Sequence, residues 1–169
     1  MFSALGDLAG EQVLDLYAGS GALGVEALSR GARHAVFVER ARSCRSVLEA
    51  NLADLALGDR SEVLGMDALR ALPLLARREQ SFDLVLLDPP YDEGALAPAL
   101  ASLRRLGLVA SGGVVVAERA KRHPLGDVQG WIAERERTYG QTVVIQLRPE
   151  PESGTPDVET EAVARHHEH

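Results

Sequence analysis

The chain has 169 residues, of which 46% are hydrophobic and 25% are charged, values typical of one globular domain that exclude a disordered chain. Its 18 basic and 25 acidic residues give a formal net charge of -7, which on first inspection argues against binding to a nucleic acid. No apolar run approaches the roughly 20 residues of a membrane-spanning helix, and the first residues lack the pattern of a signal peptide. We therefore expect a cytosolic protein without membrane partners. Cys44 is the only cysteine, which excludes an internal disulfide.

The acidic charge is unevenly distributed along the chain. Residues 149–169 hold six acidic residues and one basic residue, a balance of -5, whereas residues 1–148 hold 19 acidic and 17 basic residues, a balance of -2. The last 21 residues also lack any core-forming pattern, and the sequence therefore predicts a domain at 1–148 followed by an acidic, disordered tail at 149–169. We expect no metal site, because the histidines of this tail have no ordered partners.

Short apolar runs alternate with segments of helical periodicity through most of the domain. The nearly continuous apolar run at 82–87 is typical of a central strand that is covered on both faces. Five successive β–α steps predict an α/β fold with a doubly wound, mostly parallel sheet, because parallel neighbours need a helical crossover. A closing hairpin is expected to place one antiparallel strand at the edge. The expected strands are 13–17, 34–39, 61–64, 82–87 and 113–117, the expected helices are 22–30, 42–55, 68–77 (interrupted near Pro73) and 96–108, and the hairpin is 132–139 with 142–147.

The residues that follow the first two strands suggest a nucleoside-binding site. In an open parallel sheet, ligands bind outside the carboxyl ends of the strands. Gly19, Gly21 and Gly24 match the G-x-G-x-x-G fingerprint between a strand and a helix, where free backbone N–H groups favour an anion or carboxylate. Glu39 ends the second strand, and a carboxylate there can accept hydrogen bonds from both hydroxyls of a ribose.

Asp67 follows the third strand and has two readings. As a helix N-cap, it accepts hydrogen bonds from the first free N–H groups of the next helix. As a binding residue, it accepts a hydrogen bond from an adenine amino group while Met66 lies against the ring. The two roles are compatible, and the sequence does not choose between them.

The fourth strand ends in Asp88–Tyr91, an Asp-Pro-Pro-Tyr motif that is the most specific feature of the chain. The two prolines restrict the backbone and leave the nearby carbonyls without their usual local partners. The carboxylate of Asp88 and the carbonyl of Pro89 can then accept both protons of an amino group and orient its lone pair for attack. Tyr91 can stack on the ring that bears this amine.

Two long segments carry a family resemblance. The similarity lies in 15–32, DLYAGSGALGVEALSRGA, in 82–91, FDLVLLDPPY, and in Tyr139–Thr142. These stretches resemble the RsmD family. Its members are class I S-adenosylmethionine-dependent methyltransferases that modify the exocyclic amine of one guanine in 16S ribosomal RNA. The similarity covers roughly residues 2–148 and implies a Rossmann-like fold, S-adenosyl-L-methionine as cofactor, and 16S RNA or a small-subunit assembly particle as partner. We expect a monomer.

Family roles transfer to the matching positions of this chain. The target guanine must be unpaired or flipped out, and the methyl group passes directly to the amine without a covalent enzyme intermediate or a metal. Family members also carry a basic segment before the position of Met1, so we expect weak RNA affinity for this chain. The implied residues are Asp15, Gly19 and Gly21 for the methionine part of the cofactor, Glu39 for its ribose, Met66 and Asp67 for its adenine, Asp88, Pro89 and Tyr91 for the guanine, and Arg119, Lys121, Arg122 and His123 for RNA, with Arg104 and Arg105 as weaker candidates.

Three alternative functions are open at this stage. The glycine fingerprint and Glu39 also suit an NAD-dependent oxidoreductase, although Asp-Pro-Pro-Tyr has no role in one. The same motif suits a DNA adenine or cytosine amino-methyltransferase, which usually carries an added recognition domain. The third alternative is a truncated, non-catalytic domain that binds the cofactor.

Overall fold

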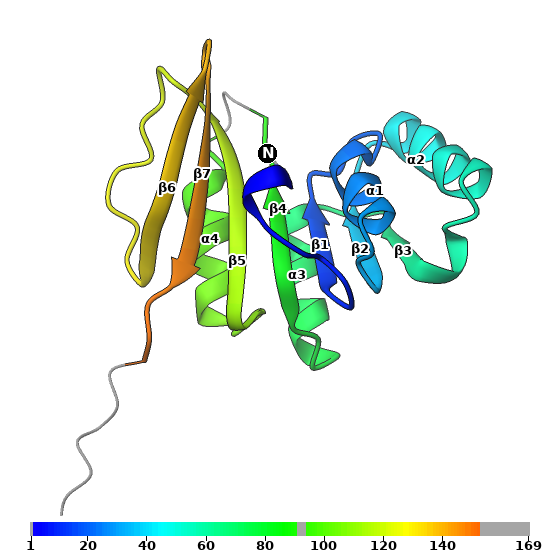
Figure 1. Cartoon of the computed structure of the whole chain (residues 1–169), viewed down its shortest axis with the longest axis horizontal. Helices are drawn as coiled ribbons and strands as arrows, with labels where there is room; N and C mark the ends of the chain where they lie inside the picture. Colours follow the sequence, from blue (N-terminus) through cyan, green and yellow to red (C-terminus); the bar gives the residue numbers. More distant parts are fainter. Residues whose placement is uncertain (1, 91–93, 153–169) are drawn as a thin grey trace, which may run out of the picture.

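The computed structural model describes residues 2–90 and 94–152, which form a seven-stranded sheet with the order β3-β2-β1-β4-β5-β7-β6 (Figure 1). Strands β1 to β5 pair with one another in parallel, and β7 pairs antiparallel with both β5 and β6. The strands are β1 Gln12–Leu16, β2 His34–Val38, β3 Ser61–Leu64, β4 Phe82–Leu87, β5 Val109–Ala120, β6 Trp131–Tyr139 and β7 Thr142–Pro149, and the helices are α1 Ala22–Ser29, α2 Arg42–Asp54, α3 Ala68–Arg77 and α4 Leu96–Arg105, with short 3-10 turns η1 Phe2–Ala4 and η2 Gly58–Arg60.

Helices cover both faces of the sheet, which confirms the doubly wound prediction. Alternate side chains of each buried strand point to opposite faces, so β1 contributes Val13 to one core and Leu14 to the other. Helices α1 and α2 pack on the face of Val13, and α3 and α4 pack on the face of Leu14. The turn η1 lies in front of β4 and β5 (Figure 1), where Phe2 joins the core of α1 and α2. No helix of the described residues is long and apolar enough to cross a membrane.

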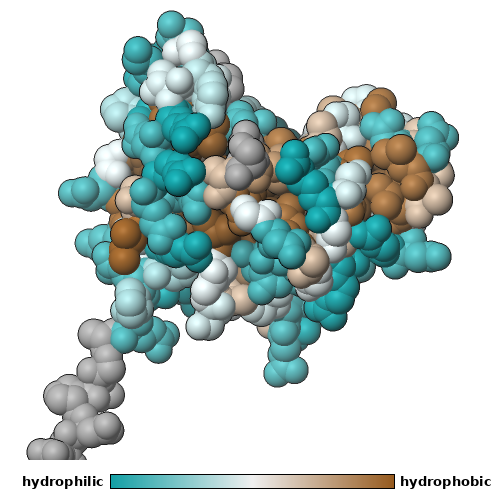
Figure 2. Space-filling model, in the orientation of Figure 1, coloured by the Kyte–Doolittle hydropathy of each residue, from teal (hydrophilic) through white to brown (hydrophobic). Residues whose placement is uncertain are grey.

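The closing hairpin supplies the antiparallel strands at one edge of the sheet, which confirms the expected antiparallel hairpin. Both strands join the sheet, and β7 lies between β5 and β6. The reason is that β7 buries Val143, Ile145 and Leu147 on the face of α4, whereas almost all of β6 beyond Trp131 is exposed. Hydrophilic residues cover this side of the molecule (Figure 2), and charged side chains on an edge strand oppose pairing with another chain.

Two further elements differ from their expected form. Strand β5 begins at Val109 instead of 113, because its first part pairs with β4 through a register shift. The small and polar residues before Gly113 lack the apolar pattern from which a strand is predicted. Helix α3 is not interrupted at Pro73. Its neighbours Leu72 and Leu75 are completely buried, and this packing outweighs the one backbone hydrogen bond that a proline removes.

The ordered chain continues slightly past the expected domain boundary at residue 148. Strand β7 includes Pro149, and the backbone N–H of Glu150 donates to the carbonyl of Gly130 at 2.8 Å. The indole N–H of Trp131 donates to the carbonyl of Leu100 at 3.1 Å and ties the start of β6 to α4. The rest of the expected tail, 153–169, lies outside the described residues.

Candidate active site

A cavity of about 600 Å³ lies at the carboxyl ends of the central strands. Parallel strands end at the same edge of a sheet, so residues from distant parts of the chain meet there. The cavity contains five of the predicted site residues and others that sequence reasoning missed. Its lining consists of Tyr17, Val38, Glu39, Arg40, Met66, Asp67, Ala68, Leu69, Asp88, Pro89, Pro90, Gly94, Ala95 and Pro98.

Glu39 connects the glycine-rich turn to the start of α2. One carboxylate oxygen accepts a hydrogen bond from the N–H of Gly19 at 2.8 Å, and the other accepts one from Ala41 at 2.9 Å. The turn needs glycine because Gly19 and Gly21 have φ angles of 59° and 83°, in the left-handed region. Each carboxylate oxygen has a second lone pair, so Glu39 can still accept hydrogen bonds from the two hydroxyls of a ribose.

Asp15 lies beneath the turn and not in the cavity. Its carboxyl group is 2% exposed and accepts a hydrogen bond from the N–H of Gly24 at 3.0 Å. Burial is the main cause that raises the pKa of Asp15 to about 8, the Gly24 hydrogen bond opposes it, and the negative charges of Asp88 and Glu39 contribute in the same direction as burial. The observed role of Asp15 is therefore to hold the start of α1, and contact with the methionine part of a cofactor stays a prediction.

Gly24 is required by the close approach of α1 to β2. A Cβ atom at this position would overlap the ring of Phe37 and would lie 2.9 Å from Oδ2 of Asp15. We predict that Gly24→Ala lowers the free energy of unfolding by about 1–3 kcal/mol, although alanine is otherwise the better helix former. Urea unfolding measures this change. Gly58→Ala is the matched control, because a Cβ there meets nothing within 4 Å, and equal stability of the two variants would contradict the close contact.

Asp67 caps helix α3 and also faces the cavity. Its Oδ1 accepts a hydrogen bond from the N–H of Arg70 at 3.2 Å, which confirms the helix-cap reading. Met66 and Asp67 both line the cavity, as the cofactor-binding reading requires. Their contact with an adenine ring stays a prediction.

The Asp-Pro-Pro segment forms one wall of the cavity. Asp88 is half-buried, Pro89 is buried and Pro90 is exposed. Burial raises the pKa of the Asp88 carboxyl group above its usual value. Tyr91 lies outside the described residues, so its predicted stacking role stays a prediction.

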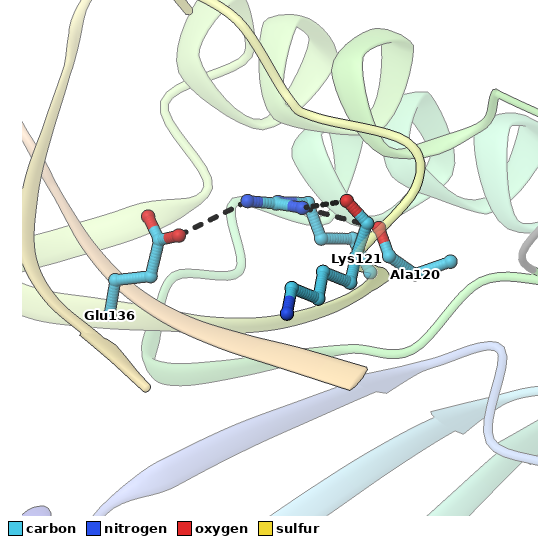
Figure 3. Close-up of polar contacts among 4 residues, drawn as sticks. Ala120, Lys121 and Glu136 are labelled. Carbon is cyan, nitrogen blue, oxygen red and sulfur yellow. Dashed lines mark hydrogen bonds and ion pairs between the residues drawn. The ribbon is translucent and has the colours of Figure 1, made fainter. Parts of the chain in front are cut away.

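The predicted RNA-contacting residues fall into two groups. The guanidinium of Arg119 is largely buried and forms an ion pair with Glu136 at 3.1 Å, and it also donates to the carbonyls of Ala120 and Lys121 (Figure 3). The side chains of Lys121 and Arg122 are exposed, as is that of His123, which accepts a hydrogen bond from Nε of Arg122 at 3.1 Å. RNA contact by any of them stays a prediction.

The weaker RNA candidates on α4 lie away from the cavity. Arg104 donates to the carbonyl of Glu150 at 2.8 Å, beside the end of β7. The cavity touches the other end of α4, through Ala95 and Pro98. Arg105 follows Arg104 at the last position of the helix, so both residues lie at the end of α4 away from the cavity.

Sequence reasoning missed the cavity residues Tyr17, Arg40, Ala95 and Pro98. Tyr17 has a φ angle of 57°, an unusual value for a residue other than glycine, and it directly follows β1. The position of Tyr17 directly after a central strand could have identified it as a site residue. The position of Arg40 directly after Glu39 could have done the same. Ala95 and Pro98 come from α4 and reach the cavity only through tertiary packing, for which the sequence has no signal.

The sheet order, the glycine-rich turn after β1 and the acidic residue after β2 define a class I methyltransferase fold. Solved structures agree. A conserved hypothetical protein of Streptococcus pyogenes is 34% identical with a TM-score of 0.81, and the match covers 88% of this chain and 92% of that one. The yhhF protein of Escherichia coli is 31% identical with a TM-score of 0.77, over 89% of this chain and 82% of that one.

The chain belongs to the family described as Conserved hypothetical protein 95, whose model matches residues 1–148. The YlbH protein of Bacillus subtilis is 40% identical over 80% of this chain and 74% of its own length. The Ribosomal RNA small subunit methyltransferase D of Escherichia coli is 35% identical over 77% of this chain, which spans only 64% of that relative. The resemblance to the RsmD family is thereby confirmed.

Proposed function

We propose that this protein is an S-adenosylmethionine-dependent methyltransferase that modifies the exocyclic amine of a guanine in 16S ribosomal RNA. The single observation that carries the proposal is the cavity, which Asp88 and Pro89 line together with Glu39 and Asp67. The names of the relatives support a small-subunit RNA substrate. Residues 1–148 form the catalytic domain of this proposal, followed by the acidic tail at 149–169, and the protein acts in the cytoplasm as a monomer.

The cavity residues fit the cofactor. A volume of about 600 Å³ lies within the range of pockets that bind nucleoside-sized ligands. Glu39 holds the ribose, Asp67 and Met66 hold the adenine, and the turn of Gly19 and Gly21 approaches the amino-acid part. When bound, S-adenosylmethionine supplies an electrophilic methyl group on a positively charged sulfur.

The residues of the chain then position the amine. Asp88 and the carbonyl of Pro89 accept the two amine protons, so the nitrogen lone pair points at the methyl carbon. As the new N–C bond forms and the S–C bond breaks, the nitrogen loses one proton, and the carboxylate of Asp88 is the nearest acceptor in this arrangement. The raised pKa of Asp88 makes it a better proton acceptor than an exposed carboxylate. Rate acceleration comes mainly from this positioning.

Transfer of a labelled methyl group tests the proposal. Undermethylated small ribosomal subunits, naked 16S RNA and DNA are incubated with the protein and labelled cofactor, and the products are digested to nucleosides. We expect label in N2-methylguanosine from one of the two RNA substrates. Label only in DNA would support the DNA amino-methyltransferase, and cofactor binding without transfer would support the non-catalytic alternative. Calorimetric binding of NAD but not of S-adenosylmethionine would support the oxidoreductase.

The exposed cations beyond β5 predict a salt-dependent RNA contact. The double variant Lys121→Ala/Arg122→Ala should weaken RNA binding and reduce the slope of log affinity against log salt by about 2, because each phosphate contact contributes about 1. Filter binding at several salt concentrations measures both quantities. Arg42→Ala, at the exposed start of α2, is the control and should leave the slope unchanged. A double variant with the slope of the wild type would exclude these residues from the RNA contact.

A further inference from the structure

A second, smaller cavity lies on the other side of the Asp-Pro-Pro segment. It has a volume of about 120 Å³, a fifth of that of the first cavity, and shares Pro89, Pro90, Gly94 and Ala95 with it. The remaining lining comes from the start of α4 and from the end of β5 with the residues that follow it. Whole cofactors need pockets of about 300 Å³ or more, so this cavity has the size for one base next to the cofactor.

Glu118 contributes the carboxylate of this cavity. Ala117 pairs with Leu87 in the parallel register of β5 and β4, so Glu118 and Asp88 are the next residues on neighbouring strands. The two residues therefore lie next to each other at this edge of the sheet, close enough for the charge of Asp88 to act on Glu118. The adjacent cation, Arg119, binds Glu136 and not Glu118.

We propose that the carboxylate of Glu118 accepts a hydrogen bond from N1–H of the target guanine and so determines which base is methylated. The inference rests on the proposed function and names the residue that selects its substrate. On the Watson–Crick edge of guanine, the N1–H donor stands directly next to the N2 amine. Two neighbouring carboxylates match these two neighbouring donors, with Asp88 at N2 and Glu118 at N1.

The same pair of carboxylates rejects the other bases that carry an amine. In adenine and cytosine the ring nitrogen next to the amine has a lone pair and no proton. A carboxylate facing that lone pair has no hydrogen-bond donor and is repelled by it, which costs much more than a missing contact. Asp-Pro-Pro-Tyr by itself holds any amine, so Glu118 supplies the discrimination that the motif lacks.

The electrostatics of the Glu118 and Asp88 carboxylates are consistent with a role in binding a ligand. Burial raises the pKa of Glu118, the neighbouring charge of Asp88 raises it further, and the positive charge of the N-terminus opposes them without cancelling the rise. Two half-buried carboxylates side by side destabilise the folded protein unless donors satisfy them. A ligand that offers two adjacent N–H groups provides those donors, and perturbed carboxyl groups in a cavity are typical of functional sites.

The test removes the N1–H donor from the base and changes the carboxylate of the protein to an amide. Small-subunit RNA is ligated around a synthetic segment, so that the nucleotide methylated by the wild type carries either guanine or 2-aminopurine. 2-Aminopurine keeps the N2 amine but has a lone pair at N1 and hydrogen in place of the O6 carbonyl oxygen, a second difference that is the same for both protein variants. The wild type should favour guanine on the order of 10²-fold. In Glu118→Gln the amide N–H can donate to N1 of 2-aminopurine, so the preference should fall at least tenfold, on the order of the cost of one unsatisfied buried polar group.

Controls separate this role from a structural one. Glu49→Gln is the same change on the exposed face of α2 and should keep the preference of the wild type. Cofactor affinity, measured by calorimetry, should change less than about threefold in Glu118→Gln. An active Glu118→Gln enzyme with an unchanged preference would overturn the inference alone, as would loss of transfer to both bases with cofactor affinity retained. Absence of transfer by the wild type to guanine would overturn the proposed function and the inference together.

Discussion

Replacing Asp88 with alanine should abolish methyl transfer, with a loss of about 10³-fold or more, while the affinity for S-adenosylmethionine changes less than about threefold. In the proposed function the carboxylate accepts a proton of the substrate amine, whereas the ribose and adenine contacts belong to Glu39, Met66 and Asp67, which follow other strands. Single-turnover transfer into 16S RNA measures the first quantity, and calorimetry measures the second.

Two further variants sharpen this prediction. Asp88→Asn keeps one carbonyl oxygen that can accept an amine proton but loses the negative charge, so its rate should lie between those of wild type and Asp88→Ala. Asp54→Ala, at the exposed end of α2, should behave as wild type. Equal losses of transfer and cofactor affinity in Asp88→Ala would indicate that Asp88 supports the shape of the cavity instead of holding the amine.

Replacing Asp15 with asparagine should flatten the dependence of stability on pH between about 4 and 8. The pKa of Asp15 is raised from 3.8 to about 8, so the folded state binds the proton more tightly than the unfolded chain. The resulting stabilisation is complete below pH 4, where both states are protonated. It is lost as the pH rises through 8, where the folded protein must hold a buried carboxylate. Each unit of pKa difference corresponds to about 1.4 kcal/mol, so the wild type should lose several kcal/mol over this range.

Urea unfolding at pH 5, 6, 7 and 8 measures the effect. Asparagine keeps an oxygen that accepts the Gly24 N–H and has no carboxyl proton to lose, so the free energy of unfolding of Asp15→Asn should vary less over the series. Burial also raises the pKa values of Glu11, Asp88 and Glu118, which leaves a residual slope of the same sign. Asp54→Asn is the control and should follow the wild-type curve. Parallel curves for wild type and Asp15→Asn would show that Asp15 is ionised in the folded protein throughout this range.

Much of the fold was predictable because its signals are local. The apolar runs of β1 to β4 and the periodicity of α1 to α3 place these elements within one or two residues of their observed limits. The signals were weaker in the C-terminal third. The start of β5 is concealed by small and polar residues, and the place of β7 between β5 and β6 depends on which strand buries more apolar surface.

By itself, the sequence determined the fold class and five residues of the cavity, because a parallel sheet gathers whatever follows its strands at one edge. These residues are Glu39, Met66, Asp67, Asp88 and Pro89. Only the tertiary structure determined which residues each side chain contacts. In the tertiary structure Asp15 lies beneath the glycine-rich turn and accepts a hydrogen bond from Gly24. Arg119 pairs with Glu136, and Glu118 lies next to Asp88 on the neighbouring strand. Such contacts join residues that are far apart in the chain, and their strength depends on burial and register, which no local pattern encodes.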